Sequence, residues 1–377
     1  MNRILHVVGG MNRAGAETMV MNLYRKIDRE KYQFDFLYFT EEICDYDEEI
    51  KQLGGRIFKI SKKDSKNVIS RTIKIIGLIK KENPFYAIHC HQLFSNAFQL
   101  LGGYLAGIKF RIAHSHNTSD VNSKKWSGRI YQKVSRFLIS KLATHFVACG
   151  EQAGGFLFPH IDKIILLPNA VDLNKFSTKC HMEPNLRELH KLNENTITIC
   201  QVGRLNPVKN HAFTIDFAKY IKDKGMDVHF FIVGDGPLKD DLTRKISDLG
   251  VDGIVTLLGV RKDIQQIMSN SDLMIMPSIH EGFPVVLVES QATGTPALIS
   301  SNISREVDLN LGLIQFCNLK DNFAVWFQKA VQLTKLKKPT QDEIRKKLIV
   351  EGFDINVSVE RLEYLYSQGS RYYSCLT

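Results

Sequence analysis

Residues 277–298 read Pro-Ser-Ile-His-Glu-Gly-Phe-Pro-Val-Val-Leu-Val-Glu-Ser-Gln-Ala-Thr-Gly-Thr-Pro-Ala-Leu, directly after the apolar run Leu273–Met276. The apolar run is typical of a buried strand, and the polar residues after it are typical of a loop. Pro284 stands where a helix would begin and Gly294 where it would end, which are the positions that these two residues favour. The stretch therefore predicts a strand, a loop and a helix in that order.

Two carboxylates in this stretch, Glu281 and Glu289, are candidates for ligand binding. Glu281 lies in the loop next to the helix N-terminus, where unpaired amides favour negative charge. At a rise of about 1.5 Å per residue, the two side chains can be about 10–12 Å apart, which suits a diphosphate with a sugar on either side. The alternative is structural: Glu281 would only stabilise the helix end, and Glu289 would lie on a solvated face. The apolar residues before Glu289 argue for a buried helix, in which a lone carboxylate is costly.

The composition is that of an ordinary globular protein. The chain has 377 residues, 44% of them hydrophobic and 24% charged, which is enough for two α/β domains. Its 7 cysteines lack CxxC spacing and indicate reduced thiols in a cytoplasmic protein, not a disulfide framework or a zinc site. The N-terminal residues are typical of a short strand and not of a signal peptide. We expect no membrane span, because no apolar run approaches ~18 residues.

The net charge of +10 is unevenly distributed. Residues 1–175 contain 26 Lys and Arg against 16 Asp and Glu, whereas the remainder contains 24 of each kind. A basic half suits phosphates, nucleic acid or an anionic membrane surface. No zinc finger, aromatic RNA-binding motif or basic low-complexity tail accompanies the charge, so nucleic acid is the least favoured partner.

Apolar strands and helical patterns alternate along both halves of the chain, which predicts parallel sheets with helices on both faces. We expect an N-terminal Rossmann-like domain at 1–172, a polar linker at 173–195, a second Rossmann-like domain at 196–355 and a helical tail at 356–377.

Candidate site residues of the first half follow strands. His114 and His116 follow the strand that begins at Phe110, and ligand sites of open α/β sheets lie beyond the carboxyl ends of strands. Either histidine could instead only satisfy backbone groups. His89 and His91 follow another strand and are interpreted as packing or acceptor-side residues.

A glycine-bearing loop at 9–17 also follows a strand and precedes a helix, which suits a phosphate, although a tight turn with positive φ is the alternative.

In the second half, Arg204 and Lys209 lie five residues apart on a strand-to-helix loop. Two such cations can hold a diphosphate from two sides and supply the charge that a metal ion would otherwise supply. A second pair, Asp45 and Asp47, forms a D-x-D sequence that could hold a metal–nucleotide, but within a dense acidic run it is interpreted as a solvated helix face.

The chain resembles the retaining glycosyltransferases of family 4, which have the GT-B fold. Glu281-Gly-Phe-Pro-x4-Glu289, followed by Ala-x-Gly-x-Pro, resembles the family's Glu-x7-Glu signature. The loop from Gly203 to Asn210 resembles its Gly-Arg-x3-x-Lys-Asn motif, and the loop at 9–17 resembles its Gly-Gly-x3-Gly-Gly/Ala-Glu loop. The resemblance spans nearly the whole chain. It implies two Rossmann-like domains facing across a cleft, with the tail crossing back to the first.

The resemblance also implies roles for individual residues. Glu281 would contact the donor sugar and Glu289 the ribose, while Arg204 and Lys209 would bind the pyrophosphate. His116 would be a catalytic residue near the sugar, with His114 as the less favoured choice. The other donor-binding positions expected are Gly15, Gly234, Val260, Arg261, Gly282, Phe283 and Pro284.

The expected function is transfer of a sugar from a nucleotide-sugar, expected to be a UDP-sugar, to a saccharide or lipid-linked acceptor. The resemblance implies retention at the anomeric carbon without a metal or another cofactor, in capsular or other surface-polysaccharide synthesis. An NAD-dependent dehydrogenase is disfavoured because neither half has GxGxxG in a βαβ unit with an acidic residue about 20 positions later. A UDP-sugar epimerase of the same fold should lack the Arg204, Lys209, Glu281 and Glu289 combination, and a non-catalytic binding module is the remaining alternative.

Residues 122–141 contain six basic residues and no acidic one. Apolar residues recur in this segment at helical spacing, at Trp126, Ile130, Val134, Phe137 and Leu138. One interpretation is a stripe that packs into the domain core, with a solvated basic back. The other is a helix on an anionic membrane surface, at the inner face of the plasma membrane.

Overall fold

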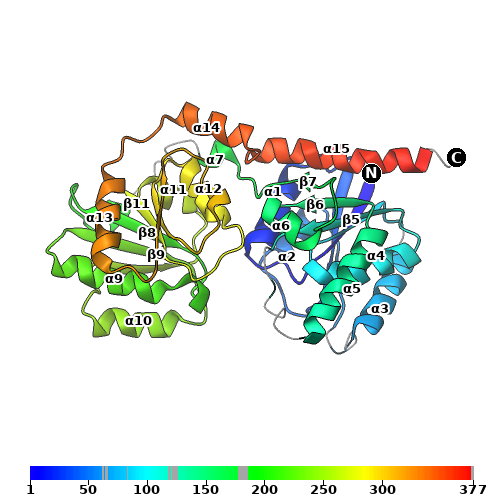
Figure 1. Ribbon diagram of the computed structural model, residues 1–377, viewed down its shortest axis with the longest axis horizontal. Helices are drawn as coiled ribbons and strands as arrows, with labels where there is room; N and C mark the ends of the chain where they lie inside the picture. The colour runs from blue at the N-terminus through cyan, green and yellow to red at the C-terminus, as the bar shows by residue number, and fades with distance from the viewer. Residues whose placement is uncertain are drawn as a thin grey trace. The chain divides into compact units, whose positions relative to one another are not determined.

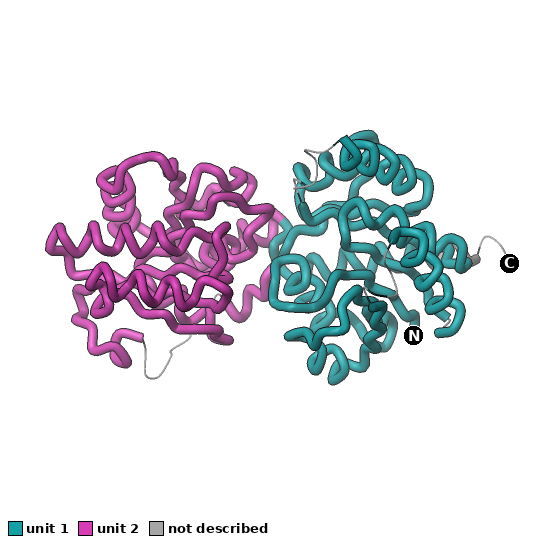
Figure 2. Tube along the Cα trace, turned by 90° about the horizontal axis from the view of Figure 1, so that it is seen from below, with its two compact units in different colours: residues 1–170, 352–377 teal, residues 171–351 magenta. Residues whose placement is uncertain are grey.

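The computed structural model describes residues 1–61, 63, 67–82, 84–117, 120, 126–176 and 186–374, with the backbone alone over 370–374. The chain divides into two compact units, shown in Figure 2: residues 1–170 with 352–377 form unit 1, and residues 171–351 form unit 2. The stretch 173–195, expected as a linker, lies within unit 2, and the tail lies within unit 1.

Unit 1 is built on a seven-stranded parallel sheet with the strand order β3-β2-β1-β4-β5-β6-β7 (Figure 1). The strands are β1 (Asn2–Val7), β2 (Tyr32–Tyr38), β3 (Ile57–Lys59), β4 (Ala87–Cys90), β5 (Phe110–Ser115), β6 (His145–Ala148) and β7 (Ile165–Leu166). The helices are α1 (Gly15–Lys26), α2 (Asp47–Gln52), α3 (Val68–Glu82), η1 (Leu93–Ser95), α4 (Asn96–Leu105), α5 (Trp126–Leu142), α6 (Glu151–Leu157) and α15 (Ile355–Ser374).

Alternate residues of the unit 1 strands enter two separate apolar cores, one on each face of the sheet. Ile4 and Phe36 pack on the face that includes residues of α1 and α15, whereas Leu5 and Leu37 pack on the face that includes residues of α3 and α4. Because both faces are covered, the strands are apolar almost throughout and do not alternate between apolar and polar residues.

Unit 2 repeats this plan with six parallel strands in the order β10-β9-β8-β11-β12-β13. The strands are β8 (Ile197–Val202), β9 (Val228–Val233), β10 (Val255–Gly259), β11 (Leu273–Met276), β12 (Ala297–Ser300) and β13 (Ile314–Cys317). The helices are α7 (Leu173–Phe176), α8 (Leu186–Leu189), η3 (Pro207–Lys209), α9 (His211–Asp223), α10 (Lys239–Asp248), α11 (Ile264–Ser269), α12 (Val285–Ala292), η4 (Arg305–Val307), α13 (Phe323–Thr334) and α14 (Gln341–Val350). The expectation of two α/β Rossmann-like domains is confirmed.

The strand order reverses direction once in each sheet, between β1 and β4 in unit 1 and between β8 and β11 in unit 2. The loops that leave the two central strands diverge to opposite faces there, which opens a crevice at the carboxyl ends of the strands. The fold therefore marks two places where ligands are expected, one in each unit.

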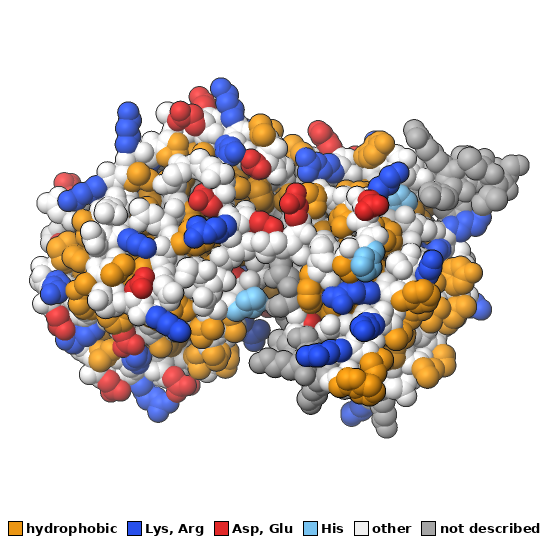
Figure 3. All heavy atoms as spheres, viewed as in Figure 1, with side chains coloured by type: hydrophobic (Ala, Val, Ile, Leu, Met, Phe, Trp, Pro, Cys, Tyr) orange, Lys and Arg blue, Asp and Glu red, His pale blue; other side chains and the backbone are white. Residues whose placement is uncertain are grey.

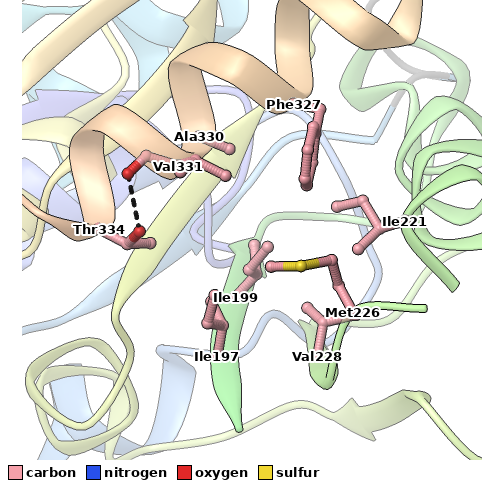
Figure 4. A pocket seen from close by; sticks show the side chains of 9 residues that line it. All are labelled: Ile197, Ile199, Ile221, Met226, Val228, Phe327, Ala330, Val331 and Thr334. Carbon is pink, nitrogen blue, oxygen red and sulfur yellow. Dashed lines mark hydrogen bonds between the residues drawn. The ribbon is translucent and has the colours of Figure 1, made fainter. Parts of the chain in front are cut away.

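A small cavity inside unit 2 is not one of these places. Its volume is about 20 Å³, and it lies between the strands and helices of the core (Figure 4). Its lining is apolar except for Thr334, whose hydroxyl donates to the Val331 carbonyl, so it lacks the two to four polar partners that a bound water needs. It is a packing defect and not a binding site.

Among the described residues, no helix is both long enough and apolar enough to cross a membrane.

Candidate functional site

The centre of the unit 2 site is an ion pair between two of the residues expected to bind the donor. Lys209 Nζ lies 2.7 Å from Glu281 Oε1, and the side chains are only 21% and 11% exposed. Lys209 ends the short helix η3 after β8, and Glu281 lies in the loop after β11, so the pair joins the two strands at which the order reverses. Both residues are expected at the donor from the sequence, but their contact is visible only in the structure.

Local structure holds both partners in place. The Asn206 side chain caps η3 by accepting a hydrogen bond from the Lys209 amide, and Pro207 occupies the first position of that helix. Asn210 adopts the left-handed conformation at φ 55° and donates from its side chain to the Pro277 carbonyl at the end of β11. The Ile279 amide donates to the Val208 carbonyl, which ties the two loops together directly. Asparagine followed by proline at 206–207 is a helix-start signal that the sequence analysis did not use.

Gly234 and Gly236 let the loop after β9 approach the loop after β8. A Cβ on Gly234 would lie 2.0 Å from the Gly203 carbonyl oxygen, and one on Gly236 would lie 2.5 Å from that of Leu205. Gly234 also has φ +138°, a conformation that favours glycine. The packing of the protein itself therefore requires a glycine at 234, whether or not a nucleotide binds there.

Three other expected donor-binding residues are more exposed. The Arg204 side chain is solvent-exposed at the end of β8, and Val260 is 61% exposed after β10. Arg261 makes two hydrogen bonds of 2.8 and 2.6 Å to Asp263, which raise the pKa of the guanidinium above its ordinary value. Arg261 is therefore already paired with the carboxylate of Asp263.

Helix α12 follows the Glu281 loop as the sequence predicted, beginning after Pro284 and ending before Gly294, which has φ +71°. Phe283 packs against the apolar core under the loop, and Gly282 lies beside it, partly exposed. Glu289 projects from the middle of α12. Burial raises the pKa of its carboxyl to about 7, and no described residue makes a hydrogen bond or ion pair with that carboxyl. An unpaired carboxyl in this position is unfavourable for stability and points to a ligand.

Three buried polar residues near the Lys209 and Glu281 pair were not predicted from the sequence: Gln201, His211 and Ser278. Gln201 Nε2 donates to the Lys209 carbonyl, while its Oε1, the Ser278 hydroxyl and both ring nitrogens of His211 find no partner among the described residues. Burial, with a smaller effect from Lys209, lowers the pKa of His211 to about 4. A polar residue at the end of an apolar strand was the available signal for Gln201 and Ser278.

In unit 1, the glycine loop at 9–17 leads into α1, and Gly15 is its exposed first helical residue. None of Gly9, Gly10 and Gly15 has a positive φ, so the alternative of a positive-φ turn is wrong. A Cβ on Gly15 would meet no protein atom within 4 Å. Nothing inside unit 1 requires glycine at position 15, and its contact with a donor or acceptor stays a prediction.

His116 belongs to a cluster of five histidines on β1, β4 and β5 and the residues just after them. The other members are His6, His89, His91 and His114, which face the side of the sheet covered by α15. His116 Nε2 lies 2.9 Å from His91 Nδ1, and its Nδ1 is enclosed without a partner among the described residues. Burial lowers the pKa of His116 to about 4, so the ring is neutral. Its catalytic role stays a prediction.

The acidic residues of the D-x-D sequence serve structural purposes. Asp47 is 4% exposed and accepts hydrogen bonds from the Cys44 amide and the Lys59 ammonium, while Asp45 accepts one from the Arg13 amide. The interpretation of this run as a solvated helix face is therefore wrong for Asp47, and neither aspartate belongs to a potential metal-binding group among the described residues.

The apolar stripe of α5 faces solvent instead of the core. Trp126 is 78% exposed, Ile130 43%, Val134 46% and Phe137 61%. The face that packs against the unit contains Gln132, Ser135 and Ile139. The interpretation of the stripe as a core-facing surface is therefore wrong, except for the partly buried Leu138. The N-terminal part of the basic segment, 122–125, lies outside the described residues.

Comparisons with known proteins agree with this arrangement. Residues 182–308 match the family described as "Glycosyl transferases group 1", and residues 13–175 match "Glycosyltransferase Family 4". The chain is 38% identical over 369 residues to a "Putative glycosyltransferase EpsF" of Bacillus subtilis, covering 97% of this chain and 96% of that protein. It is 28% identical over 319 residues to the "UDP-Gal:alpha-D-GlcNAc-diphosphoundecaprenol alpha-1,3-galactosyltransferase" of Escherichia coli, covering 81% and 79%.

The fold is similar to that of solved structures. Anabaena Alr3699/HepE in complex with UDP superposes with a TM-score of 0.76 at 17% identity, covering 98% of this chain and all of that one. The lipopolysaccharide outer core galactosyltransferase WaaB gives a TM-score of 0.68 at 14% identity, covering 98% and 99%. The chain has two Rossmann-like sheets, and Glu281 and Glu289 lie on the loop and the helix that follow β11. It is also similar over its full length to a glycosyltransferase. The chain therefore belongs to family 4 of the glycosyltransferases and has the GT-B fold.

Proposed function

We propose that this glycosyltransferase of polysaccharide synthesis transfers a sugar from a UDP-sugar, with retention of configuration at the anomeric carbon and without a metal ion. The nucleotide assignment is supported by the E. coli relative, whose name specifies UDP-Gal, and by the UDP complex of the Anabaena protein of the same fold.

The contact between Lys209 and Glu281 is the observation that carries the proposal. In a nucleotide-sugar the distal phosphate is bonded directly to the anomeric carbon, so a phosphate ligand and a sugar ligand must stand next to each other. Lys209 and Glu281 are such a pair, 2.7 Å apart at the carboxyl ends of β8 and β11. When a donor binds, Lys209 turns to the diphosphate and Glu281 accepts hydrogen bonds from hydroxyls of the sugar.

Arg204 and Lys209 provide the positive charge for the leaving diphosphate. The bond between the anomeric carbon and the phosphate oxygen breaks, and a bond from the acceptor hydroxyl to the same face of that carbon forms. The hydroxyl proton passes to the departing phosphate oxygen, so the step needs no base from the protein and no second reactant. Fixed cations lower the energy of the charge that develops on this oxygen.

Glu289 lies on α12, the helix that follows the Glu281 loop, and is proposed to be further from the reacting atoms than Glu281. We assign it to the ribose of the nucleotide, because its unpaired carboxyl can accept hydrogen bonds from two neighbouring hydroxyls. Burial holds the pKa of this carboxyl near 7, and hydroxyl donors would lower it by stabilising the carboxylate.

The acceptor is proposed to be lipid-linked, with unit 1 bound to the cytoplasmic surface of an anionic membrane through α5. The exposed apolar residues of α5 are flanked by the exposed basic residues Arg129, Lys133 and Lys141. Neighbouring helices add Ile69 and Ile73 of α3 and Leu105 of α4, all more than half exposed. Figure 3 shows hydrophobic side chains gathered on this side of unit 1, next to Lys and Arg. Apolar side chains that insert and cations that bind anionic headgroups are what an interfacial helix needs.

A panel of UDP-, GDP- and ADP-sugars tests the donor assignment. We expect UDP-sugars to raise the thermal midpoint of the protein and to be hydrolysed slowly in the absence of acceptor, with release of a sugar whose initial anomeric configuration is that of the donor. Stabilisation by GDP-sugars alone would contradict the UDP assignment, and an inverted product would contradict retention.

A further inference from the structure

The five histidines of unit 1 include the candidate catalytic residue His116, and the other four have no role in the proposed transfer step. All five occupy neighbouring parallel strands or the residues directly after them. His6 on β1 lies opposite His89 on β4, while His91 directly follows β4 and His114 lies near the end of β5. The H-x-H spacing at 89–91 and 114–116 places both histidines of each pair on the same face of the sheet. Interior strands of a parallel sheet are normally apolar, so five imidazoles at this position need an explanation.

Most of the ring nitrogens are hydrogen-bonded to one another in a single chain. From His116 Nε2 the chain runs to His91 at 2.9 Å, from His91 to His6 at 3.0 Å, and from His6 to the Tyr366 hydroxyl at 3.5 Å. From the same hydroxyl it continues to His89 at 3.0 Å and from His89 to His114 Nδ1 at 3.1 Å.

The two ends of this chain are buried and have no hydrogen-bond partner among the described residues. They are His114 Nε2 and His116 Nδ1, on residues whose rings stack with their centroids 4.0 Å apart. His114 is only 1% exposed. A buried nitrogen without a hydrogen bond is unfavourable and is seldom left so in a folded protein, except where an ion or a water completes it.

Three of the rings can coordinate one metal ion. His91, His114 and His116 each offer a nitrogen such that all three nitrogens lie within 4.8 Å of one another. In a tetrahedral site with Zn–N bonds of about 2.0–2.1 Å, ligand nitrogens stand about 3.3 Å apart, so the side chains would have to rotate to bring the three nitrogens to this spacing.

We infer that His91, His114 and His116 form a binding site for a divalent transition metal ion of the Zn²⁺ class. Neutral imidazole nitrogens are ligands for Zn²⁺, Co²⁺, Ni²⁺ and Cu²⁺, whereas Mg²⁺ and Ca²⁺ require oxygen ligands.

The other nitrogens of two ligands already have the partners that metal-binding histidines require. With an ion on His114 Nε2, the Nδ1–H donates to His89, whose own N–H donates to the Tyr366 oxygen. With an ion on His91 Nδ1, the Nε2–H donates to His6, whose other N–H reaches the same oxygen. A hydroxyl oxygen has two lone pairs and can accept both bonds, so His6, His89 and Tyr366 orient the ligands.

This site shares no residue with the cations proposed for the diphosphate, Arg204 and Lys209 of unit 2, but it does include His116, the histidine expected near the sugar. An ion bound here would join β4 to β5 and stabilise the folded form of unit 1.

The test uses Co²⁺ as a spectroscopic probe on the full chain after removal of metals with a chelator. We expect visible ligand-field absorption that saturates at a single Co²⁺ per chain and is displaced by Zn²⁺. His114→Gln and His116→Gln should abolish the absorption, and His6→Gln should weaken the affinity roughly 10–100-fold through the lost orienting hydrogen bond. His229→Gln, which changes a buried histidine of unit 2, is the matched control and should leave Co²⁺ binding unchanged.

X-ray absorption on the Zn²⁺-loaded wild type gives a result that does not depend on how the variants fold. Three imidazole ligands are expected. Fewer than three, no Co²⁺ absorption from folded wild-type protein, or binding that persists in His114→Gln and His116→Gln would overturn the assignment. In those cases the cluster is a hydrogen-bonded network only.

Discussion

At the scale of single residues, Arg204 and Lys209 are predicted to act on the diphosphate and not on the nucleoside. Each charge-assisted contact contributes about 1.5–3 kcal/mol, so Arg204→Ala and Lys209→Ala should each weaken UDP binding roughly 10–150-fold. Calorimetry should find uridine affinity nearly unchanged. Arg244→Ala on α10, an exposed arginine outside the strand-end loops, is the control. Equal losses for uridine and UDP would show that the phosphate site has been misplaced.

Glu281 and Glu289 are predicted to separate transfer from nucleotide binding. Glu281→Gln should abolish transfer and leave UDP affinity within about twofold, because its partner in the complex is the sugar. Glu289→Ala should weaken UDP itself through the lost ribose contact. Parallel measurements of transfer rate and UDP affinity on both variants decide the matter, and the reverse pattern would exchange the two assignments.

Glu289 also predicts a dependence of stability on pH. Its carboxyl has a pKa of about 7 in the folded protein and 4.5 as the ordinary value. Below pH 4.5 both states hold the proton and the group contributes nothing. As pH rises to 7 the unfolded chain loses its proton first, so the free energy of unfolding falls by at most about 3 kcal/mol, and less because the side chain is partly exposed.

Glu289→Gln removes this titration while keeping the shape of the side chain. Without nucleotide, the variant should melt several degrees above the wild type at pH 8 and at nearly the same temperature at pH 4. A constant difference across that range would mean that the Glu289 carboxyl is not shifted in the folded protein.

At the scale of elements, α5 is predicted to bind membranes with a face that contributes little to folding. Trp126→Ala should change the free energy of unfolding by no more than about 0.5 kcal/mol, since the ring is exposed. Ile139→Ala, one of the few apolar positions on the buried face, should cost about 2–5 kcal/mol. The comparison of the two thermal midpoints tests which face of the helix is covered.

Substitutions on the exposed face of α5 also separate folding from membrane binding. Wild-type protein should sediment with anionic vesicles at low salt and be released as salt rises, because headgroup attraction is screened over a Debye length of ~8–10 Å. Trp126→Ala and Lys133→Glu should reduce sedimentation while donor hydrolysis in solution continues. Wild-type protein that stays in the supernatant would refute the membrane proposal, and the positive charge of the first half would then serve a phosphorylated acceptor.

At the scale of the whole molecule, the two units contribute different chemistry. Unit 2 contains the charged residues proposed for the donor, and unit 1 contains the exposed apolar and basic surface proposed for the acceptor membrane. If Arg204 and Lys209 supply the positive charge for the diphosphate, EDTA should not lower the transfer rate. A rate lost in EDTA and restored by Mg²⁺ or Mn²⁺ would show that a metal ion takes part at the diphosphate.

Much of the fold could be predicted because its signals are local. Apolar runs of four to six residues that end in glycine, proline or polar residues mark buried parallel strands, and their alternation with helices leaves few arrangements open. Pro284 and Gly294 placed α12 closely. The two clusters of donor-binding candidates, at 204–209 and 281–289, follow central strands for the same reason: side chains near a ligand must stand at strand ends.

What each side chain touches was decided by tertiary structure. Lys209 and Glu281 are 72 positions apart, and only the pairing of β8 with β11 brings their charges together. His6 carried no motif, and its place beside His91 depends on the order of three strands. Periodicity revealed the apolar stripe of α5 but not its direction, because a helix has the same pattern whichever face its neighbours cover. The sequence by itself determined the helices and strands and their order. The packing of elements that are distant in sequence determined which polar groups are buried together and which apolar groups remain exposed. Burial and exposure depend on neighbours that the local sequence does not specify.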